Sequence, residues 1–400
     1  MRQDSGMPAA SAPDPSRSNS ASRLLTLVHQ NGTLSRAQLT KLTGLNRSTI
    51  GVLIGQLAAQ GLVVETAPAG EAQVGRPSPD IRPHPGVAAL AVNPEIDAVT
   101  IGLVGLGGRV VKMIRYPTGR IPTAEEAVNI AAAVIAGMRG ELDAGYRIAG
   151  IGIAVPGLVT APDGTVRRAP HLGWKNQPVA RMLSEATGYP ALVANDASLA
   201  AEAEMVFGAG GGIRNLVYLN GGASGIGGGI VSEGRLLAGV SGYAGEIGHT
   251  FVRTDGLPCH CGACGCLETE VRQAPLFELL ELDAGDPAGL AVALSAATDP
   301  LVVAEIHRQL GFLAIALRNV VNVFNPEAIV LDGFLAALHA AAPAELERAV
   351  AAQSMREPAA QVHISGAALG PELMMVGAAE LAFAGLLADP LAWRPAGSPQ

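Results

Sequence analysis

All four cysteines of this 400-residue chain fall within one eight-residue stretch, at positions 259, 261, 264 and 266. A disulfide framework would spread its cysteines along the chain, so a metal-binding loop in a reducing compartment is the better interpretation. Structural zinc takes either four cysteines or three cysteines and a histidine. A loop this short rarely closes all four positions itself. The candidate histidines are His249, upstream of the loop, and His260 within it. Free buried or reactive thiols are the alternative.

The composition is that of a folded protein. Hydrophobic residues make up 49% of the chain and charged residues 16%, which excludes a disordered chain or an acidic tail. Residues 1–20 are rich in Ser, Pro and Ala and lack the apolar segment of a secretory signal, so we expect a disordered lead-in and a cytoplasmic protein. Every window of 18 apolar residues has a polar or charged interruption, so no membrane span is expected.

Charge divides the chain into a basic head and an acidic body. Residues 1–85 hold eight Lys/Arg and five Asp/Glu, a net charge of +3, whereas residues 86–400 hold 19 and 30, a net charge of −11. A small basic head on an acidic body indicates that only the head meets a polyanion. Chance clustering of charge is the alternative, so the local pattern must decide.

The head has the pattern of a helix-turn-helix with a wing. Apolar residues recur at helical spacing over 22–30, and Asn31-Gly32 ends that helix. Ser35 and Gln38 form a capping box for a second helix, whose predicted buried face is Leu39 and Leu42. Asn46 caps a third helix, and residues 62–66 then predict a strand. A small helical hairpin that packs on the body is the alternative.

Four residues are the predicted DNA contacts. Arg47, Ser48 and Thr49 begin the third helix, which would enter the major groove. Arg76 lies between Gly75 and Pro77 at the tip of the wing, where it would reach a narrow minor groove. Glycine at 51 and 55 offers no side chain, so base reading would depend on few residues.

The body alternates strands and helices from residue 87 onward, which predicts an α/β fold with ligands at the carboxyl ends of its strands. Asn195-Asp196 follows a short predicted strand, where the Asp would accept a proton or a hydrogen bond from a sugar hydroxyl. An N-cap for the following helix is the alternative, and both roles are compatible. The glycine-rich loop 221–229 would cradle a phosphate or would be a plain turn.

Several motifs, in order, resemble those of the ROK family of sugar kinases and sugar-responsive repressors. They are Ala154-Val155-Pro156-Gly157, Asn195-Asp196-Ala197, Gly225-Ile226-Gly227-Gly228-Gly229, Gly245-Glu246-Ile247-Gly248-His249 and the cysteine loop up to Glu268. The likeness spans about residues 87–390. The head is similar to the winged helix-turn-helix of the family's repressors, including its Gly-Arg-Pro wing.

The resemblance implies a two-lobed, actin-like (RNase H-like) α/β fold with a sugar in the cleft. The implied domains are a lead-in at 1–20, a winged head at 21–85 and a sugar-sensing domain at 86–400. Within that domain, one lobe would span about 86–206 plus the C-terminal helix, and the other about 207–370. The implied sugar contacts are Gly157, Asn195, Asp196, Glu246, His249 and Glu268. One structural zinc per chain would bind His249, Cys259, Cys261 and Cys266, with Cys264 as a bystander.

The resemblance leaves a choice between a kinase and a regulator. A kinase of this family needs an Asp-x-Gly-Gly-Thr-type loop for nucleotide phosphates, but residues 93–97 read Asn-Pro-Glu-Ile-Asp. The loop has no glycine to let the backbone approach a phosphate, and Asp97 would repel one. Ala223-Ser224 and Leu331-Asp332-Gly333 also depart from the pattern. We therefore expect a DNA-binding regulator that is not an enzyme, in which Asp196, the equivalent of the kinase base, only binds sugar.

Two alternatives stay open: an ATP-dependent ROK sugar kinase, and a sugar-binding protein with no role on DNA. For the regulator, the expected partners are operator DNA, a sugar or sugar-phosphate effector and further copies of the chain. A single head of +3 would neutralise too few phosphates for tight binding, so a homodimer or a dimer of dimers is expected. The segment Arg82-Pro83-His84-Pro85 would transmit lobe movement to the head as a stiff connection.

Overall fold

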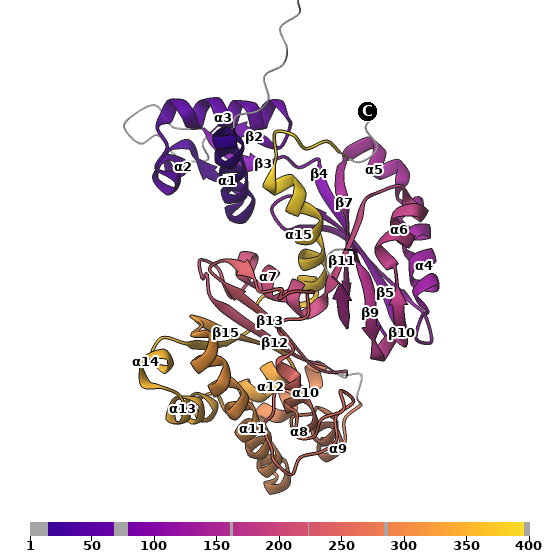
Figure 1. Cartoon of the computed structure of the whole chain (residues 1–400), viewed down its shortest axis with the longest axis vertical. Coiled ribbons are helices and arrows are strands. Elements are labelled where there is room, and N and C mark those ends of the chain that lie inside the picture. The colour runs from indigo at the N-terminus through magenta and orange to yellow at the C-terminus, as the bar shows by residue number, and fades with distance from the viewer. Residues whose placement is uncertain (1–14, 68–78, 161–162, 223, 284–286, 396–400) are drawn as a thin grey trace, which may run out of the picture.

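The computed structural model of the chain describes residues 15–67, 79–160, 163–222, 224–283 and 287–395. Figure 1 shows a small helical head, drawn in indigo, at one end of two α/β lobes. A five-stranded sheet forms the centre of each lobe. This arrangement confirms the predicted α/β body of two lobes, and it carries an N-terminal helical region where the winged head was predicted.

The head consists of three helices and a three-stranded sheet. The helices are α1 (Pro15–Asn31), α2 (Arg36–Thr43) and α3 (Arg47–Ala59). The strands β1 (Leu34–Ser35), β2 (Val63–Thr66) and β3 (Asp80–Pro83) form an antiparallel sheet in the order β1-β3-β2. The capping box of Ser35 with Gln38 and the cap of Asn46 on the Thr49 N–H are both present. Local hydrogen-bond chemistry therefore fixes where α2 and α3 begin.

Two details of the head differ from the sequence predictions, and a third adds to one of them. Helix α1 begins at Pro15 rather than near residue 22, since proline fits the first helical position without loss of a hydrogen bond. Residues 15–20 are therefore helical and do not belong to a disordered lead-in. Leu42 is 47% exposed rather than buried, because only Leu39 faces α1 and α3. The predicted stiff connection is partly strand, since Arg82 and Pro83 pair with Val64 and Val63 in the wing sheet.

The first lobe is built on a mixed sheet in the order β11-β7-β4-β5-β6. Its strands are β4 (Val87–Pro94), β5 (Ala98–Gly105), β6 (Arg109–Pro117), β7 (Arg147–Val155) and β11 (Ala191–Asn195). Helices α4 (Ala124–Gly137), α5 (Arg139–Gly145) and α6 (Val179–Thr187) cover one face. A small antiparallel sheet of β8 (Leu158–Thr160), β9 (Thr165–Ala169) and β10 (Trp174–Gln177) extends from the end of β7.

The second lobe is built on a sheet in the order β14-β13-β12-β15-β16. Its strands are β12 (Leu216–Gly222), β13 (Gly225–Ser232), β14 (Arg235–Leu236), β15 (Ala328–Gly333) and β16 (His363–Gly366). One face packs on helices α8 (Leu267–Glu270), α9 (Ala274–Leu280), α10 (Pro287–Ser295), α11 (Pro300–Phe324), α12 (Phe334–Ala341), α13 (Pro343–Gln353) and α14 (Arg356–Ala359).

Two helices lie between the lobes and join them. Helix α7 (Asp196–Phe207) packs on the second sheet through Ala197, Ala200 and Ala201, and on helix α15 (Leu373–Ala388). Helix α15 covers the first sheet on the face opposite α4 and α6 (Figure 1). Small side chains on α7 allow this close three-layer packing.

The head is not tethered loosely to the body, because the two share one hydrophobic core. Leu24 and Leu25 of α1 belong to the same buried cluster as Ala89 and Ala91 of the first sheet and Phe383 of α15. Movement of α15 or of the first sheet therefore acts directly on the head.

Two helical segments, α11 and residues 370–388, are long and apolar enough to cross a membrane by length and composition alone. In this fold both supply core residues. Leu310, Leu313 and Leu317 of α11 are buried in the second lobe, and Val376 and Phe383 of α15 are buried between the lobes and beneath the head.

Candidate functional site

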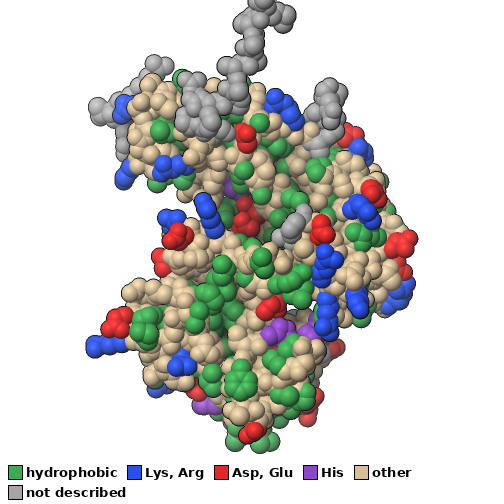
Figure 2. Space-filling view, viewed as in Figure 1, with side chains coloured by type: hydrophobic (Ala, Val, Ile, Leu, Met, Phe, Trp, Pro, Cys, Tyr) green, Lys and Arg blue, Asp and Glu red, His purple; other side chains and the backbone are tan. Residues whose placement is uncertain are grey.

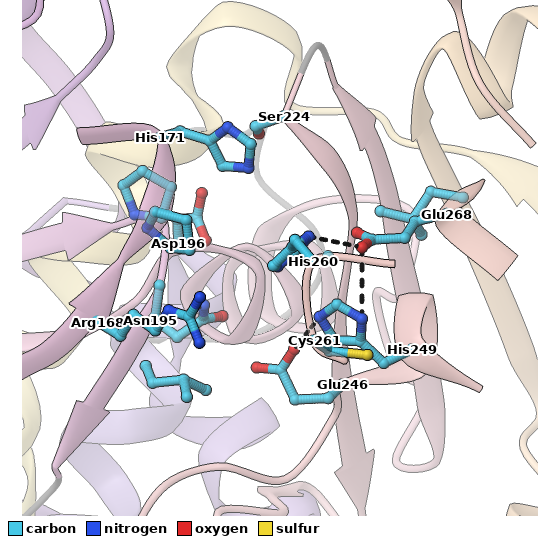
Figure 3. Close-up of a pocket in the computed structure, with 16 residues that line it drawn as sticks. Arg168, His171, Asn195, Asp196, Ser224, Glu246, His249, His260, Cys261 and Glu268 are labelled. Atoms are coloured by element: carbon cyan, nitrogen blue, oxygen red, sulfur yellow. Dashed lines mark hydrogen bonds and ion pairs between the residues drawn. The ribbon is translucent and has the colours of Figure 1, made fainter. Parts of the chain in front are cut away.

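A cavity of about 340 Å³ lies between the two lobes, at the carboxyl ends of β7 and β11 (Figure 3). This edge is where ligands bind in α/β sheets. All six residues that the family resemblance assigned to sugar line this cavity: Gly157, Asn195, Asp196, Glu246, His249 and Glu268. The structure therefore brings together, from positions 157 to 268, a set of side chains suited to polyol hydroxyls.

One wall of the cavity comes from the first lobe. Asn195 ends β11 and caps α7, since its Oδ1 accepts the Ser198 N–H at 2.9 Å. Its Nδ2 donates to the Gly157 carbonyl at 3.1 Å, which leaves one amide N–H for a ligand. The Asn195 side chain can therefore both cap α7 and contact a ligand, the two roles that the sequence suggested. Gly157 is required here, because a Cβ would lie 2.4 Å from the carbonyl oxygen of Arg168.

Asp196 opens α7 and lines the cavity. Burial raises the pKa of its carboxyl to about 6, while its hydrogen bond from the Ala197 N–H works in the opposite direction. A carboxylate that is charged at neutral pH and poorly solvated is a strong hydrogen-bond acceptor for a hydroxyl group.

The opposite wall comes from the second lobe. Glu246 precedes the short 3₁₀ helix Ile247–His249 and His249 ends it, and His249 Nε2 lies 3.8 Å from Glu246 Oε2. Burial raises the pKa of Glu246. Glu268 begins α8 and is buried, with its Oε1 3.1 Å from His260 Nδ1. Gly225 has a φ of 122°, and a Cβ there would lie 2.4 Å from Glu268 Oε2, so glycine keeps this carboxylate in place.

A cluster of candidate metal ligands lies directly behind this wall. One donor atom from each of His249, Cys259, Cys261 and Cys266 lies within 4.8 Å of the other three. Cys261 and Cys266 sulfurs are 3.7 Å apart, and His249 Nδ1 is 3.5 Å from Cys259 Sγ. Tetrahedral zinc, with Zn–S bonds of about 2.3 Å and Zn–N bonds of about 2.0 Å, requires separations of about 3.8 Å and about 3.5 Å. The donor set fits four-coordinate zinc.

The rival ligands are less well placed. Cys264 is exposed and is not among the four clustered donors. His260 forms a second, overlapping group with His249 and Glu268, and its Nδ1 lies 4.0 Å from Cys259 Sγ. His260 and Glu268 both line the cavity (Figure 3), and Glu268 Oε1 also accepts a hydrogen bond from Cys259 Sγ at 3.0 Å.

Sequence reasoning missed four cavity-lining residues: Arg168, His171, Ser224 and His260 as a cavity residue. Arg168 is on β9 and pairs with Leu158, which brings it beside Gly157. Figure 3 shows its side chain beside Asn195, on the opposite side of the cavity from Glu246. Asp163-Gly164 is a hairpin signal that predicts this return of the chain. Burial lowers the pKa of His171, which lies opposite His260.

The turn at residues 93–97 carries two carboxylates held by one arginine. Arg115 Nε donates to Glu95 at 3.2 Å, and its Nη2 donates to Asp97 at 2.7 Å. Asn93 Nδ2 donates to Glu95 at 3.3 Å. Burial raises the pKa of Glu95. This turn therefore presents negatively charged carboxylate oxygens. A phosphate-binding loop would instead present free backbone N–H groups.

The predicted DNA-contacting residues lie on the head. Arg47 and Ser48 are exposed at the start of α3, but Ser48 Oγ donates to Asn46 at 2.7 Å. Thr49 is partly buried. Val52, one turn further along the same helix, is 59% exposed and was missed as a contact. Arg76 lies outside the described residues.

Comparison with known proteins places the chain in a family. The model described as "ROK family" matches residues 92–384. A glucokinase of Halalkalibacterium halodurans is 33% identical over 261 residues, 58% of this chain and 78% of its own. A putative xylose repressor of Caldicellulosiruptor sp. is 29% identical over 344 residues, 77% of this chain and 81% of its own.

Among solved structures, a ROK family transcriptional regulator described as a homologue of the E. coli MLC protein is similar with a TM-score of 0.77 at 28% identity. The match covers 94% of this chain and 98% of that one. Residues 86–400 alone are less than four fifths of the chain, so this similarity extends into the head. With the family match, the shared architecture and the ordered site motifs together, the chain belongs to the ROK family.

Proposed function

We propose that this protein is a cytoplasmic, DNA-binding repressor of genes for carbohydrate use, with a sugar or sugar derivative as its effector. The proposal depends mainly on the N-terminal head, which the match to a ROK regulator includes. Similarity to a ROK regulator extends over 94% of the chain, whereas the glucokinase match covers 58%. In the head, α3 presents an exposed N-terminal turn next to the sheet β1-β3-β2, the arrangement of a recognition helix beside a wing.

The cavity supports a polyol ligand. Asp196, Glu246 and Glu268 supply acceptors for hydroxyl hydrogens, and the free N–H of Asn195 supplies a donor. Acceptors stand on both lobes, so a bound sugar would favour one separation of the lobes over others. Arg168, on the same cavity wall as Asn195, would add a cation for a carboxylate or phosphate on the effector.

A structural zinc fits the same proposal. His249, Cys259, Cys261 and Cys266 would hold it, and bound zinc would supply a rigid tetrahedral centre with no open position. His249 faces the sulfurs through Nδ1, so Nε2 remains as the N–H that points toward Glu246 and the cavity. Cys266 directly precedes α8, so the zinc loop would also fix the position of Glu268 in the first turn of that helix.

The turn at 93–97 argues against nucleotide binding and therefore against the kinase alternative. Glu95 and Asp97 place negative charge where a family kinase would need glycine N–H groups, and Arg115 is already paired with both carboxylates. Repulsion between these carboxylates and a triphosphate would weaken ATP binding.

The test is selection of DNA by the full-length, zinc-loaded protein from a random double-stranded library. We expect a palindromic consensus, since two heads of a symmetric dimer would read two half-sites. Arg47→Ala is the test variant, and Arg139→Ala, which changes an exposed arginine on α5, is its matched control. No enriched sequence with the wild-type protein would contradict the proposal.

A further inference from the structure

A histidine of the head is buried at the junction with the body. His29, near the end of α1, is 1% exposed, and its Nε2 lies 2.9 Å from Glu380 Oε2 on α15. Its Nδ1 accepts the Gly107 N–H from the turn between β5 and β6, at 2.8 Å. Because Nδ1 accepts, Nε2 carries the proton and donates it to Glu380. One imidazole thus joins three segments that are far apart in the sequence.

Helix α7 reaches this junction with its last residue. The Phe207 ring lies 5.2 Å from the His29 ring in an edge-to-face contact, and Phe383 of α15 makes a similar contact at 5.7 Å. Phe207 also fills the space over Gly108, where a Cβ would lie 2.8 Å from the ring. About one and a half turns earlier on α7, burial raises the pKa of Glu202 to about 7, and the charge of Glu380 adds to this shift.

The other end of α7 is the cavity itself. Asn195 caps the helix and Asp196 is its first residue, and both line the cavity. The helix has 12 residues, so it spans about 18 Å. A single rigid element therefore connects the cavity to the buried histidine of the head.

The head has a second attachment that does not involve α7. Arg147, at the start of β7, donates from Nη1 to the Gln60 carbonyl at 2.6 Å and from Nη2 to the Gly61 carbonyl, which holds the end of α3. Between the head and the second lobe lies a cavity of about 640 Å³, lined by Gln30 and Asn31 of α1 and by Arg214 of the second lobe (Figure 2). This space would let α1 shift while Arg147 keeps α3 anchored.

We propose that α7 is the mechanical link between the cavity and the head, acting on His29 through Phe207. This proposal rests on the proposed function for its biological meaning, but its physical content concerns only the fold. Loss of the Asn195 cap of α7 must alter the stability of α1, and by linkage a change at the junction must alter the first turn of α7. His29 is a positioning residue in this scheme.

The test is hydrogen–deuterium exchange of the full-length, zinc-loaded protein without DNA or sugar. Asn195→Ala removes the cap of α7, and its matched control Thr123→Ala removes the equivalent cap of α4, which does not touch the head. We expect about fivefold faster exchange in the capped helix of each variant, the factor for a lost N-cap. Only Asn195→Ala should also speed exchange, by about twofold, at residues 24–31 and 105–108.

A reciprocal variant, Phe207→Leu, keeps the test decisive if Asn195→Ala does not fold. It should speed exchange at residues 196–199, at the cavity end of α7. Unchanged exchange in α1 of Asn195→Ala, or equal acceleration of α1 by Thr123→Ala, would overturn the proposal. The exchange experiment contains neither DNA nor sugar, so a negative result would not contradict the proposed function. A negative result in the DNA selection would likewise not contradict the coupling through α7.

Discussion

Single residues at the cavity serve two structural purposes at once. Asn195 caps α7, binds the Gly157 carbonyl and still keeps one N–H for a ligand. His249 turns one ring nitrogen toward the thiols and the other toward Glu246. Substitution of either residue would therefore change both the fold around the cavity and the ligand contacts.

The cysteines differ in role, and metal content should show it. Cys259→Ser, Cys261→Ser and Cys266→Ser should each lose the zinc, because each removes one of four clustered donors. Cys264→Ser is the matched control and should retain about one zinc per chain, measured by inductively coupled plasma mass spectrometry. Chelation of wild-type protein should lower its melting temperature. A zinc site that needs Cys264 but not His249 would contradict the ligand set.

Glu202 should make the free energy of unfolding fall as the pH rises. Its folded pKa, about 7, lies above the unfolded value, so the folded state binds more protons between about pH 4.5 and 7. The stabilisation is full below pH 4.5 and is lost as the pH rises toward 7. Glu202→Gln does not titrate, so its melting temperature should exceed that of the wild type at pH 8 and match it at pH 5.

The control for Glu202 is Glu185→Gln, which changes a glutamate whose side chain is 71% exposed on α6. Its melting temperature should track that of the wild type at both pH values. An equal gain in both variants at pH 8 would show a general charge effect rather than burial at the α7 junction.

At the scale of helices and strands, side-chain caps account for where helices α2 and α3 of the head begin. The capping box of Ser35 and the cap of Asn46 set the starts of α2 and α3 as predicted, and the left-handed Gly44 ends α2. The outward face of α3 offers few side chains that could contact DNA bases. Ser48 is tied to Asn46 and Gly51 has no side chain, so Arg47 and Val52 carry most of the available surface.

Arg47 should therefore dominate base recognition by α3. Arg47→Ala should weaken binding to the selected DNA by about 1–3 kcal/mol, the range for a bidentate contact with guanine. Val52→Ala should cost less, by loss of apolar contact with a thymine methyl group. Titration with fluorescent DNA measures both. The same affinity in Arg47→Ala and wild type would remove α3 from the interface as we describe it.

At the scale of the whole molecule, two lobes close around one cavity. The lobes already meet at its rim, where Thr160 Oγ1 of the first lobe and Tyr243 Oη of the second lie 3.0 Å apart. Because α7 and α15 sit between the sheets and under the head, lobe movement and head position are parts of one packing arrangement.

The lobes should not transfer phosphate. With D-glucose or D-xylose and ATP-Mg²⁺, product formation should stay at background, since Glu95 and Asp97 repel the nucleotide phosphates. A coupled assay for ADP measures this. Turnover that is abolished by Asp196→Asn would establish the kinase alternative instead.

Cavity variants should separate DNA binding from sensing. A thermal-shift screen of sugars, sugar acids and sugar phosphates identifies the effector by stabilisation of the fold. Asp196→Ala and Glu246→Ala should keep wild-type affinity for DNA but lose the response to that effector, which for typical couplings is about 5–150-fold in affinity. Release of either variant from DNA at the wild-type effector concentration would place the effector site outside the cavity.

Features that depend on neighbours along the chain could be predicted from the sequence. Helix ends follow from caps within three residues, strands follow from apolar runs, and the candidate zinc ligands Cys259, Cys261 and Cys266 lie close together in any fold of their loop. The ordered motifs then placed the six cavity residues through the family resemblance. The predicted burial of Leu42 was wrong, because burial depends on partners elsewhere in the chain. The strand pairing of Arg82 and Pro83 was not foreseen for the same reason.

Which distant groups meet depends on how the sheets and helices pack. His29 and Glu380 are 351 positions apart, and no local pattern relates them. Arg168 and His171 enter the cavity because a hairpin folds back over Gly157, and Arg115 meets Glu95 and Asp97 across β5 and β6. Backbone hydrogen bonds and periodicity act over a few residues, whereas these contacts follow from how sheets and helices pack.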